Sequence, residues 1–362
     1  MSAGRDPKIE ILTVAVVLLL TGCGPRTVQQ PGPQRASPGS AVTLVGAGAS
    51  FPFPLYSKWA QVYEPRGVRV NYQSIGSGGG IRQFIARTVD FGASDSPMTA
   101  AQVAQAGGAV LHVPMTAGAV VLAYNLTGVG PGLNFTPDVL AGIFLGEITR
   151  WDDPQLAQAN PSTVLPAADL VVVHRSDGSG TTAIFTNYLS NVSAAWKSRV
   201  GQGTSVSWPT GLGGKGNEGV AQLVELTPNA VGYVELAYAI TTKMTFGSVR
   251  NRAGRFIAPS LKSTTAAVDG AVDTVPDDFR VFITDPGGPD AYPLAGFTWI
   301  LIREEQPDAR KGEALAGFLW WATHDGQRYA SPLLYAPLPP RLVVRIEVSL
   351  RRITAEGRRL LP

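Results

Sequence analysis

Short apolar runs alternate with helix-like periodicity along most of this chain. Val42–Val45 is an apolar run, and Phe53, Tyr56 and Ala60 fall on one face of a helix predicted over 52–63. Val68–Ser74 then alternates apolar and polar positions as a strand does. The same order of strand, small-residue turn and helix recurs further along the chain. This rhythm predicts an α/β fold with a largely parallel sheet.

Four turns of small residues lie where predicted strands end and helices begin. They are Gly46–Ser50, Gly76–Gly80, Ser94–Ser96 and Asp177–Thr182. In open α/β sheets, ligands bind where strands end. Any one of these turns could simply cap the helix that follows it. Four of them in one chain, with Arg175 and Asp95 beside them, favour a shared ligand.

The segment His174–Thr182 carries the clearest chemistry. It follows the apolar run Leu170–Val173 and opens into a predicted helix. The unpaired amides in the first turn of a helix attract an anion. Arg175 adds a planar charge suited to a tetrahedral oxyanion. These features predict half of an oxyanion site, although Ser179 and Thr181 could also act only as helix caps.

Asp95 is the candidate acceptor in such a site. It could equally be an N-cap in the Ser-Asp-Ser-Pro turn. An ionised carboxylate only accepts hydrogen bonds, so it can receive one from the hydroxyl of a protonated oxyanion. An oxyanion without a proton would place lone pairs against it. Such mismatches discriminate between ligands far better than size does.

Nucleotide and metal chemistry have little support in the sequence. The run Gly211–Asn217 resembles a phosphate-binding P-loop, but Gly216 stands where Ser or Thr must follow the lysine. No dinucleotide fingerprint is complete, because Ile81 occupies the final glycine position of the run that begins at Gly76. The three histidines lie far apart in the sequence. We expect no metal and no cofactor.

An enzyme that uses Ser179 or Ser77 as a nucleophile is the main alternative from another class. It needs a base, and His174 alternates along its strand to the face opposite Arg175. A G-x-S-x-G nucleophile elbow is also missing, because Gly178 stands directly before Ser179. We therefore expect a binding protein without catalysis.

The first forty residues indicate export from the cytoplasm. Ile11–Leu20 is apolar except for Thr13, which is too short to span a bilayer but typical of a signal-peptide core. Leu20-Thr21-Gly22-Cys23 then resembles a bacterial lipobox, which predicts a signal peptide over 1–22 and lipidation of Cys23. Residues 23–41 are rich in Pro, Gly and Ser and predict a tether reaching roughly 25 Å.

Composition and charge fit a globular body rather than a nucleic-acid binder. The chain has 362 residues, enough for two domains, and a formal net charge of only +3. Arginines concentrate in the tail from Arg341 onward. Such a tail can bind nucleic acid or an anionic membrane. We interpret it instead as a solvated helix face with a frayed end.

Taken together, the motifs resemble the substrate-binding protein of the bacterial high-affinity phosphate ABC importer. The similarity runs from about Val42 to about Arg345. It includes the motifs GAGASFPFPLYSKWA, YQSIGSGGG, TVDFGASDSPM, FLGEITRWDDP, HRSDGSGTTAIFTNYL and WPTGLGGKGNEGV. So many motifs in order make the match specific to this family. Ser50 stands where many relatives have threonine, and it keeps the hydroxyl.

The resemblance implies a two-lobed periplasmic-binding-protein (Venus-flytrap) fold with the anion in the cleft between the lobes. Lobe 1 would comprise 42–123 and 297–362, and lobe 2 would comprise 124–296. The two hinge crossings would lie near Tyr124-Asn125 and Leu294-Ala295. Asp177 would orient Arg175, and Asp95 would accept a hydrogen bond from the P–OH of phosphate, which sulfate lacks. The implied phosphate ligands are Ala49, Ser50, Phe51, Ser77, Asp95, Arg175, Ser179, Gly180 and Thr181.

The resemblance also implies the biological role. A monomer held outside the cytoplasmic membrane by the lipid on Cys23, or located in the periplasm, would close on phosphate and dock on the permease subunits. The alternative is a surface lipoprotein that binds phosphate for sensing or adhesion without a transporter. Nothing in the sequence separates these two roles.

Overall fold

The computed structural model describes residues 41–362. The predicted signal peptide, Cys23 and all of the predicted tether except Ala41 lie outside the described residues. Within the described part of the chain, none of the helices combines the length and apolar character needed to cross a bilayer.

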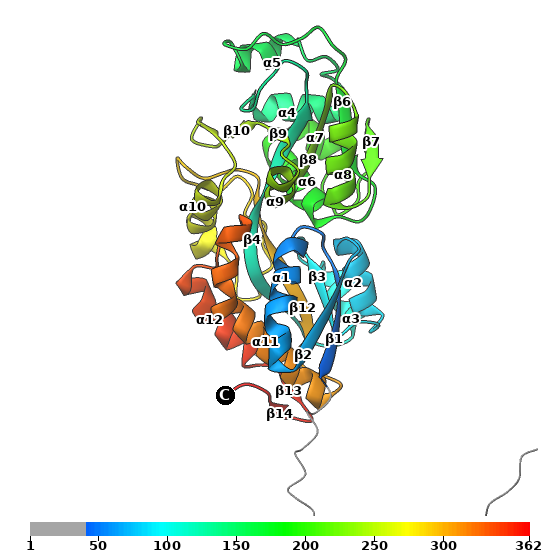
Figure 1. Ribbon diagram of the computed structural model, residues 1–362, viewed down its shortest axis with the longest axis vertical. Helices are drawn as coiled ribbons and strands as arrows, with labels where there is room; N and C mark the ends of the chain where they lie inside the picture. Colours follow the sequence, from blue (N-terminus) through cyan, green and yellow to red (C-terminus); the bar gives the residue numbers. More distant parts are fainter. Residues whose placement is uncertain (1–40) are drawn as a thin grey trace, which may run out of the picture. The chain divides into compact units, whose positions relative to one another are not determined.

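The described residues form a mixed nine-stranded sheet that runs through the whole body (Figure 1). Its strand order is β2-β1-β3-β12-β4-β8-β6-β7, and β9 pairs with β4 off this path. The strands are β1 (Val42–Gly48), β2 (Val68–Ser74), β3 (Phe91–Ser94), β4 (Val110–Asn125), β6 (Val171–Arg175), β7 (Leu212–Gly214), β8 (Ala230–Glu235), β9 (Thr245–Phe246) and β12 (Ala295–Arg303).

The prediction of a largely parallel sheet is wrong at the centre of this sheet. Pairing is parallel within β1-β2-β3 and within β8-β6-β7. In contrast, β12 is antiparallel to both β3 and β4, and β4 is antiparallel to β8. The alternation of strand and helix patterns predicts local strand–helix units. The direction in which a distant strand inserts into the sheet depends instead on the path of the chain between these units.

Strand β4 joins the two halves of the sheet. Its residues up to Ala119 pair with β12, and those from Val120 onward pair with β8. All of it except its two end residues is buried, so it reads as a continuous apolar run rather than an alternating one. The predicted lobe boundaries at 123/124 and 296/297 fall inside β4 and β12, and they remain a prediction.

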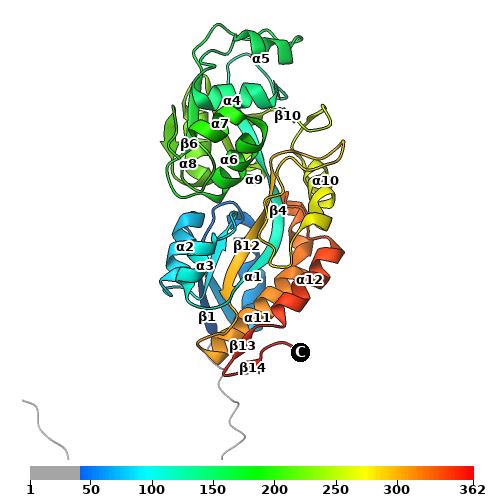
Figure 2. The ribbon, with the colours of Figure 1, turned by 180° about the vertical axis from the view of Figure 1, so that it is seen from behind.

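Helices cover both halves of the sheet. In Figure 1, β1, β2, β3 and β12 lie in the lower half and β6, β7 and β8 in the upper half, and the view from behind shows the same division (Figure 2). The lower helices are α1 (Phe53–Tyr63), α2 (Ser77–Ile85), α3 (Ala100–Ala106), α11 (Ala309–Thr323) and α12 (Pro340–Leu350). The upper helices are α4 (Pro137–Leu145), α5 (Pro154–Ala159), α6 (Gly180–Val192), α7 (Ala194–Arg199), α8 (Gly216–Leu226) and α9 (Leu236–Thr241).

Smaller elements complete the body. A three-stranded sheet contains β5 (Asn134–Phe135), β10 (Ser248–Arg250) and β11 (Phe256–Ile257), and it is followed by α10 (Leu261–Ala271). Helix starts follow ordinary capping chemistry: the hydroxyl of Thr99 accepts from the backbone N–H of Gln102, and the Gln102 side chain accepts from the Thr99 N–H.

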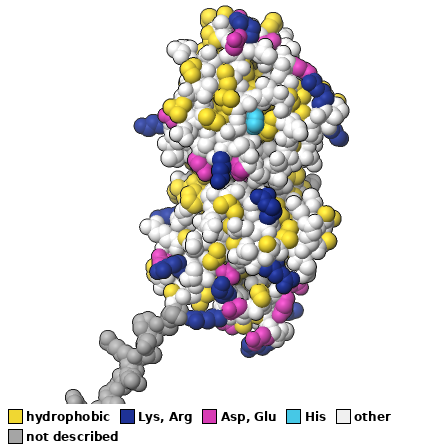
Figure 3. All heavy atoms as spheres, turned by 90° about the vertical axis from the view of Figure 1, so that its right-hand side faces the viewer, with side chains coloured by type: hydrophobic (Ala, Val, Ile, Leu, Met, Phe, Trp, Pro, Cys, Tyr) yellow, Lys and Arg dark blue, Asp and Glu magenta, His cyan; other side chains and the backbone are white. Residues whose placement is uncertain are grey.

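The C-terminal tail is folded, so the expectation of a frayed end is wrong. It forms α12 and the hairpin of β13 (Thr354–Ala355) and β14 (Arg358–Arg359). Its arginines form ion pairs, including Arg351 with Glu347 and Arg352 with Glu304. Basic and acidic side chains are also interspersed on the face shown in Figure 3. These arginines therefore serve local pairing rather than a single basic patch.

Candidate functional site

Two groups of turns at the ends of strands face each other. The first turn group holds Ser50, Ser77 and Asp95, which follow β1, β2 and β3. The second turn group holds Arg175 at the end of β6 and the first residues of α6. The sequence-predicted anion residues are thus brought together from positions more than one hundred residues apart.

The two turn groups are in direct contact. The N–H of Gly78 donates to the carbonyl of Gly178 at 2.9 Å. Gly76 has a φ of 82°, and a Cβ on it would lie 2.2 Å from the Asp177 Oδ2 atom. A Cβ on Gly180 would lie 2.5 Å from both the Asp95 Oδ2 and the Ser77 Oγ atoms. Glycine is therefore required at these positions for the turns to approach so closely.

Arg175 is buried and fixed in place by Asp177. Its Nε and Nη2 atoms donate to the two carboxyl oxygens of Asp177 at 2.7 and 2.6 Å. The N–H of Gly216 adds a third hydrogen bond to that carboxylate at 3.0 Å. Burial alone would raise the pKa of Asp177, but the hydrogen bonds and charge of Arg175 hold that pKa below its usual value. The Nη1 edge of Arg175 is left to face Thr181 at 3.4 Å.

Two buried serines accept hydrogen bonds from the protein. The hydroxyl of Ser77 accepts from the backbone N–H of Asp95 at 3.2 Å. The hydroxyl of Ser179 accepts from the backbone N–H of Thr182 at 3.0 Å, which caps α6. A hydroxyl has one hydrogen and two lone pairs. Since lone pairs are used here, the O–H of each serine is free to donate to a ligand.

The hydroxyls of Ser50 and Thr181 likewise accept hydrogen bonds from the protein, in this case from Asn217. The Asn217 side-chain amide donates to the Ser50 hydroxyl at 3.0 Å and to the Thr181 hydroxyl at 3.2 Å. Its backbone N–H also donates to the Ser50 hydroxyl at 3.2 Å. The Asn217 Oδ1 atom in turn accepts from the backbone N–H of Glu235 at 2.9 Å, which fixes the orientation of the amide. Asn217 therefore ties the two turn groups together and leaves both hydroxyl hydrogens to donate.

The start of α6 supplies backbone donors. Gly180 and Thr181 are the first two residues of this thirteen-residue helix, so their N–H groups have no partner within the helix. They lie beside Arg175 and directly against Asp95. This combination of a helix N-terminus and a guanidinium is an anion-binding arrangement.

Asp95 is the exception among these donors. Its side chain is buried, and neither carboxyl oxygen has a hydrogen-bond partner among the described residues. Burial raises the pKa of Asp95 to about 7, although the nearby hydroxyl of Thr298, the charge of Arg175 and the hydroxyl of Ser77 act in the opposite direction. A buried acceptor without a partner is costly unless a ligand supplies a donor.

Two predicted ligands at the end of β1 differ in their availability. The carbonyl of Phe51 accepts from the Tyr335 hydroxyl at 2.7 Å, which holds that stretch of backbone. The N–H of Ala49, in contrast, donates to Ala93 at 3.0 Å, and its carbonyl accepts from Tyr72 at 2.6 Å. Both polar groups of Ala49 are therefore occupied within the protein, and we do not retain Ala49 as a ligand.

Comparison with known proteins assigns this chain to a family. Residues 33–325 match the model of the PBP superfamily domain. The chain is 45% identical over 349 residues to the phosphate-binding protein PstS of Xylella fastidiosa strain 9a5c, covering 93% of this chain and 95% of that protein. It is 47% identical over 311 residues to PstS of Pasteurella multocida, covering 85% of this chain and 89% of that protein. The chain belongs to this PstS family of the PBP superfamily.

Solved structures support the same fold. A high-affinity periplasmic phosphate-binding protein (PfluDING) bound with phosphate superposes with a TM-score of 0.68 at 20% identity, covering 85% of this chain and 94% of that chain. A phosphate-binding protein from Stenotrophomonas maltophilia gives a TM-score of 0.66 at 21% identity, covering 85% of this chain and 93% of that chain. The predicted two-lobed binding-protein fold is confirmed.

Sequence reasoning missed Asn217 in this family member. The run Gly211–Asn217 fails the P-loop pattern, and although it lies in the motif WPTGLGGKGNEGV, no site role was predicted for Asn217. In the structure it forms β7 and the start of α8, and it delivers the Gly216 N–H to Asp177 and the Asn217 amide to Ser50. The available signal was a fifth glycine-rich turn at the junction of a strand and a helix.

The position of His174 does not favour nucleophilic catalysis. Its ring stacks on Trp208 with centroids 4.8 Å apart, and its Nδ1 atom lies 3.1 Å from the carbonyl oxygen of Arg175. The Ser179 hydroxyl is meanwhile engaged as a helix cap. Among residues 41–362, no cluster of three or more His, Cys, Asp or Glu side chains could hold a metal ion.

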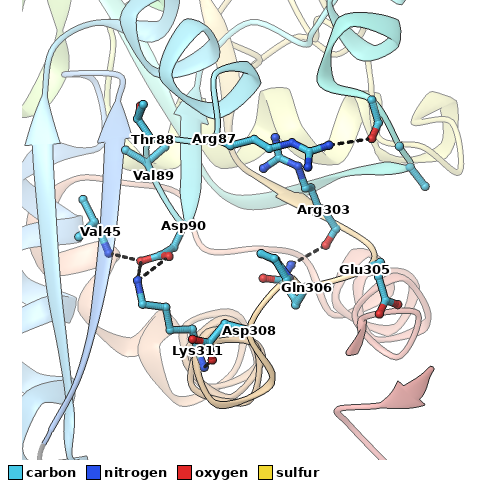
Figure 4. Close-up of a pocket in the computed structure, with 14 residues that line it drawn as sticks. Val45, Arg87, Thr88, Val89, Asp90, Arg303, Glu305, Gln306, Asp308 and Lys311 are labelled. Carbon is cyan, nitrogen blue, oxygen red and sulfur yellow. Dashed lines mark hydrogen bonds and ion pairs between the residues drawn. The ribbon is translucent and has the colours of Figure 1, made fainter. Parts of the chain in front are cut away.

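The open cavity in Figure 4 is separate from this site. It has a volume of about 480 Å³ and is lined by the segment 87–90 before β3, the end of β12 and the start of α11. Its charged side chains are largely used for structure: Lys311 pairs with Asp90 at 2.9 Å, and Asp90 also accepts from the N–H of Val45. Arg303 donates to the carbonyl of Phe84 at the end of α2.

Proposed function

We propose that this chain binds inorganic phosphate between its two turn groups and delivers it to the permease of a phosphate ABC importer. The family membership and the names of its relatives support this role. The observation that carries the proposal is the buried carboxyl of Asp95, which lacks a partner among converging donors. The proposed ligands are Ser50, the backbone of Phe51, Ser77, Asp95, Arg175, Ser179, Gly180 and Thr181, with Asp177 orienting Arg175.

The chemistry of this set selects a protonated oxyanion. Arg175, the hydroxyls and the first amides of α6 can satisfy three oxygens of a tetrahedral anion. The fourth position meets Asp95, which accepts the hydrogen of P–OH when it is ionised. Sulfate would bring a lone pair to the same place. Phosphate therefore binds and sulfate is rejected.

Closure of two lobes on the anion follows from the division of the ligands. Ser50, Ser77 and Asp95 belong to proposed lobe 1 (42–123 and 297–362), whereas Arg175 and the start of α6 belong to proposed lobe 2 (124–296). An anion that contacts both groups binds the closed form better than the open form, so it shifts the population toward closure. The closed form would be the one that docks on the permease.

We further propose that the protein is a monomer outside the cytoplasmic membrane, attached through a lipid on Cys23. The lipobox-like sequence at residues 20–23 supports this attachment. One acyl chain gives only marginal membrane binding, so a durable anchor requires more than one. We propose no catalytic step, because the only histidine near the serines in sequence, His174, is stacked on Trp208.

Titration with phosphate and with sulfate tests the binding role. Tryptophan fluorescence and calorimetry on the wild-type protein should report tight binding of phosphate and weak binding of sulfate. Equal affinity for both anions at pH 9, where Asp95 is ionised, would refute the role of Asp95. Phosphate uptake by a strain that lacks the protein tests the transport role: normal uptake would favour sensing or adhesion instead.

A further inference from the structure

A second buried carboxyl, that of Glu235, lies at the junction of the two halves of the sheet. Glu235 ends β8 and pairs with Val120, the residue at which β4 changes its partner from β12 to β8. Its side chain is completely buried, and its Oε1 atom has no hydrogen-bond partner among the described residues. A Cβ on Gly118 would lie 3.3 Å from that oxygen, so the carboxyl is packed against the backbone of β4.

A chain of hydrogen bonds links Glu235 to the phosphate site. The Oε2 atom of Glu235 accepts from the N–H of Ala237 at 2.8 Å and lies 3.2 Å from the Tyr335 hydroxyl. That hydroxyl lies only 2.7 Å from the carbonyl of Phe51, a proposed ligand through its backbone. Glu235 belongs to proposed lobe 2 and Tyr335 to proposed lobe 1, so the chain crosses between the lobes.

The number of available hydrogens decides which protonation state of Glu235 fits this series of hydrogen bonds. The Tyr335 hydroxyl has one hydrogen, and the shorter distance assigns it to the carbonyl of Phe51. A protonated Glu235 can then donate to the lone pair of Tyr335, so that every contact has one donor and one acceptor. An ionised Glu235 would instead compete with Phe51 for the single hydrogen of Tyr335.

The surroundings of Glu235 also disfavour its charge. The polar groups around its carboxyl are the backbone amides of Ala237 and Tyr238 and the phenol of Tyr335, all uncharged. The titratable groups that face it are Asp95, which follows β3, Tyr335 and the Tyr238 hydroxyl of α9. Burial raises the pKa of Glu235 well above its usual value, and this effect outweighs the contacts with Ala237 and Tyr335, which lower the pKa; the negative charge of Asp95 raises it further. A bound phosphate would add more negative charge nearby.

We propose that Glu235 is a positioning residue for the phosphate site, acting as a neutral carboxylic acid that donates to Tyr335 and thereby holds the Phe51 backbone when the lobes close. The inference rests on the proposed phosphate-binding function. It assigns to Glu235 a role in closure without direct contact with the anion.

Calorimetric titration of the full chain with inorganic phosphate at pH 7 tests this role. Glu235→Ala should weaken phosphate binding about tenfold and Tyr335→Phe about fivefold. Because both side chains belong to the same series of hydrogen bonds, the phosphate affinity of the double variant should fall by no more than about tenfold. Glu235→Gln stays neutral and should recover most of the loss. Glu225→Gln, on the exposed face of α8, is the matched control and should bind as wild type.

Two calorimetric outcomes would overturn the inference. One is a Glu235→Gln variant that binds as weakly as Glu235→Ala, because the negative charge would then be the functional form. The other is a double variant whose loss is the product of the single losses. If the wild-type protein fails to bind phosphate at all, it is the proposed function that fails.

Infrared difference spectroscopy in H₂O and D₂O reads the proton directly and does not depend on a folded Glu235 variant. In Asp95→Asn, which removes the other buried carboxyl of the site, a protonated-carboxyl band should persist at pH 8. Absence of that band would overturn the inference even if no Glu235 variant folds.

Discussion

Protonation of Asp95 should control how well the site rejects sulfate. Both carboxyl oxygens are buried without a partner, and burial raises the pKa of this group from 3.8 to about 7. An ionised Asp95 repels sulfate, but a protonated Asp95 can donate to one of its oxygens. We therefore expect sulfate to bind only to the fraction of protein in which Asp95 is protonated.

The magnitude follows from the pKa. Raising the pKa from 3.8 to about 7 corresponds to about 4 kcal/mol for ionising the buried carboxyl. Because the pKa in the folded protein is raised, Asp95 contributes stability to the folded protein that is fully present below pH 4 and is lost as the pH rises through 7. At pH 9 only about one molecule in 100 has the proton, so the apparent sulfate affinity should fall about 100-fold between pH 5 and pH 9.

Isothermal titration calorimetry with sulfate at pH 5, 7 and 9, at constant ionic strength, measures this dependence. Asp95→Asn has an amide that donates at every pH, so its sulfate affinity should be flat. At pH 9 this variant should bind sulfate about 100-fold more tightly than wild type. Asp269→Asn, at an exposed position on α10, is the matched control and should follow the wild-type curve.

Phosphate provides the internal comparison because it keeps at least one P–OH throughout this range. Its affinity should not show the 100-fold fall. A sulfate affinity that does not vary with pH in the wild type, or one that still falls 100-fold in Asp95→Asn, would refute the assignment of Asp95 as the selecting acceptor.

Three further substitutions test the rest of the site. Arg175→Ala removes a charged, bidentate donor and should weaken phosphate binding by about 100-fold or more in calorimetry; unchanged affinity would discard the site. Asn217→Ala removes the amide that joins Ser50 to Thr181, so the affinity should fall about fivefold to tenfold, mainly through faster release in stopped-flow fluorescence. Release at the wild-type rate would contradict this role. Gly180→Ala places a methyl group 2.5 Å from the carboxyl of Asp95 and should block closure, which small-angle scattering with and without phosphate would detect as a missing contraction. A normal contraction would mean that the turns have more room than the structure shows.

The sequence alone was sufficient to predict several local units and to nominate most residues of the proposed site. Apolar periodicity predicted β2 over Val68–Ser74 and a helix close to Phe53–Tyr63, because burial repeats every two residues in a strand and every 3.6 in a helix. Arg175 and Asp177 lie two residues apart on one turn, so their pairing depends mainly on local geometry.

Other features depended on atoms that are distant in the chain. The antiparallel insertion of β12 beside β3 and β4 could not be read from a local rhythm. The N–H of Ala49 donates to the carbonyl of Ala93, so we do not propose Ala49 as a ligand. Asn217 reaches Ser50 across 167 residues and positions its hydroxyl, a role that was not predicted.

Apolar periodicity predicts which side chains are buried, and motifs indicate which turns consist of small and polar residues. Neither determines which lone pair or hydrogen of a buried group is already used. That choice is made only when strands from both halves of the sheet bring donors and acceptors within about 3 Å of each other. The sequence thus determined the types of group at the site, and the tertiary structure decided which of them remain free to hold an anion.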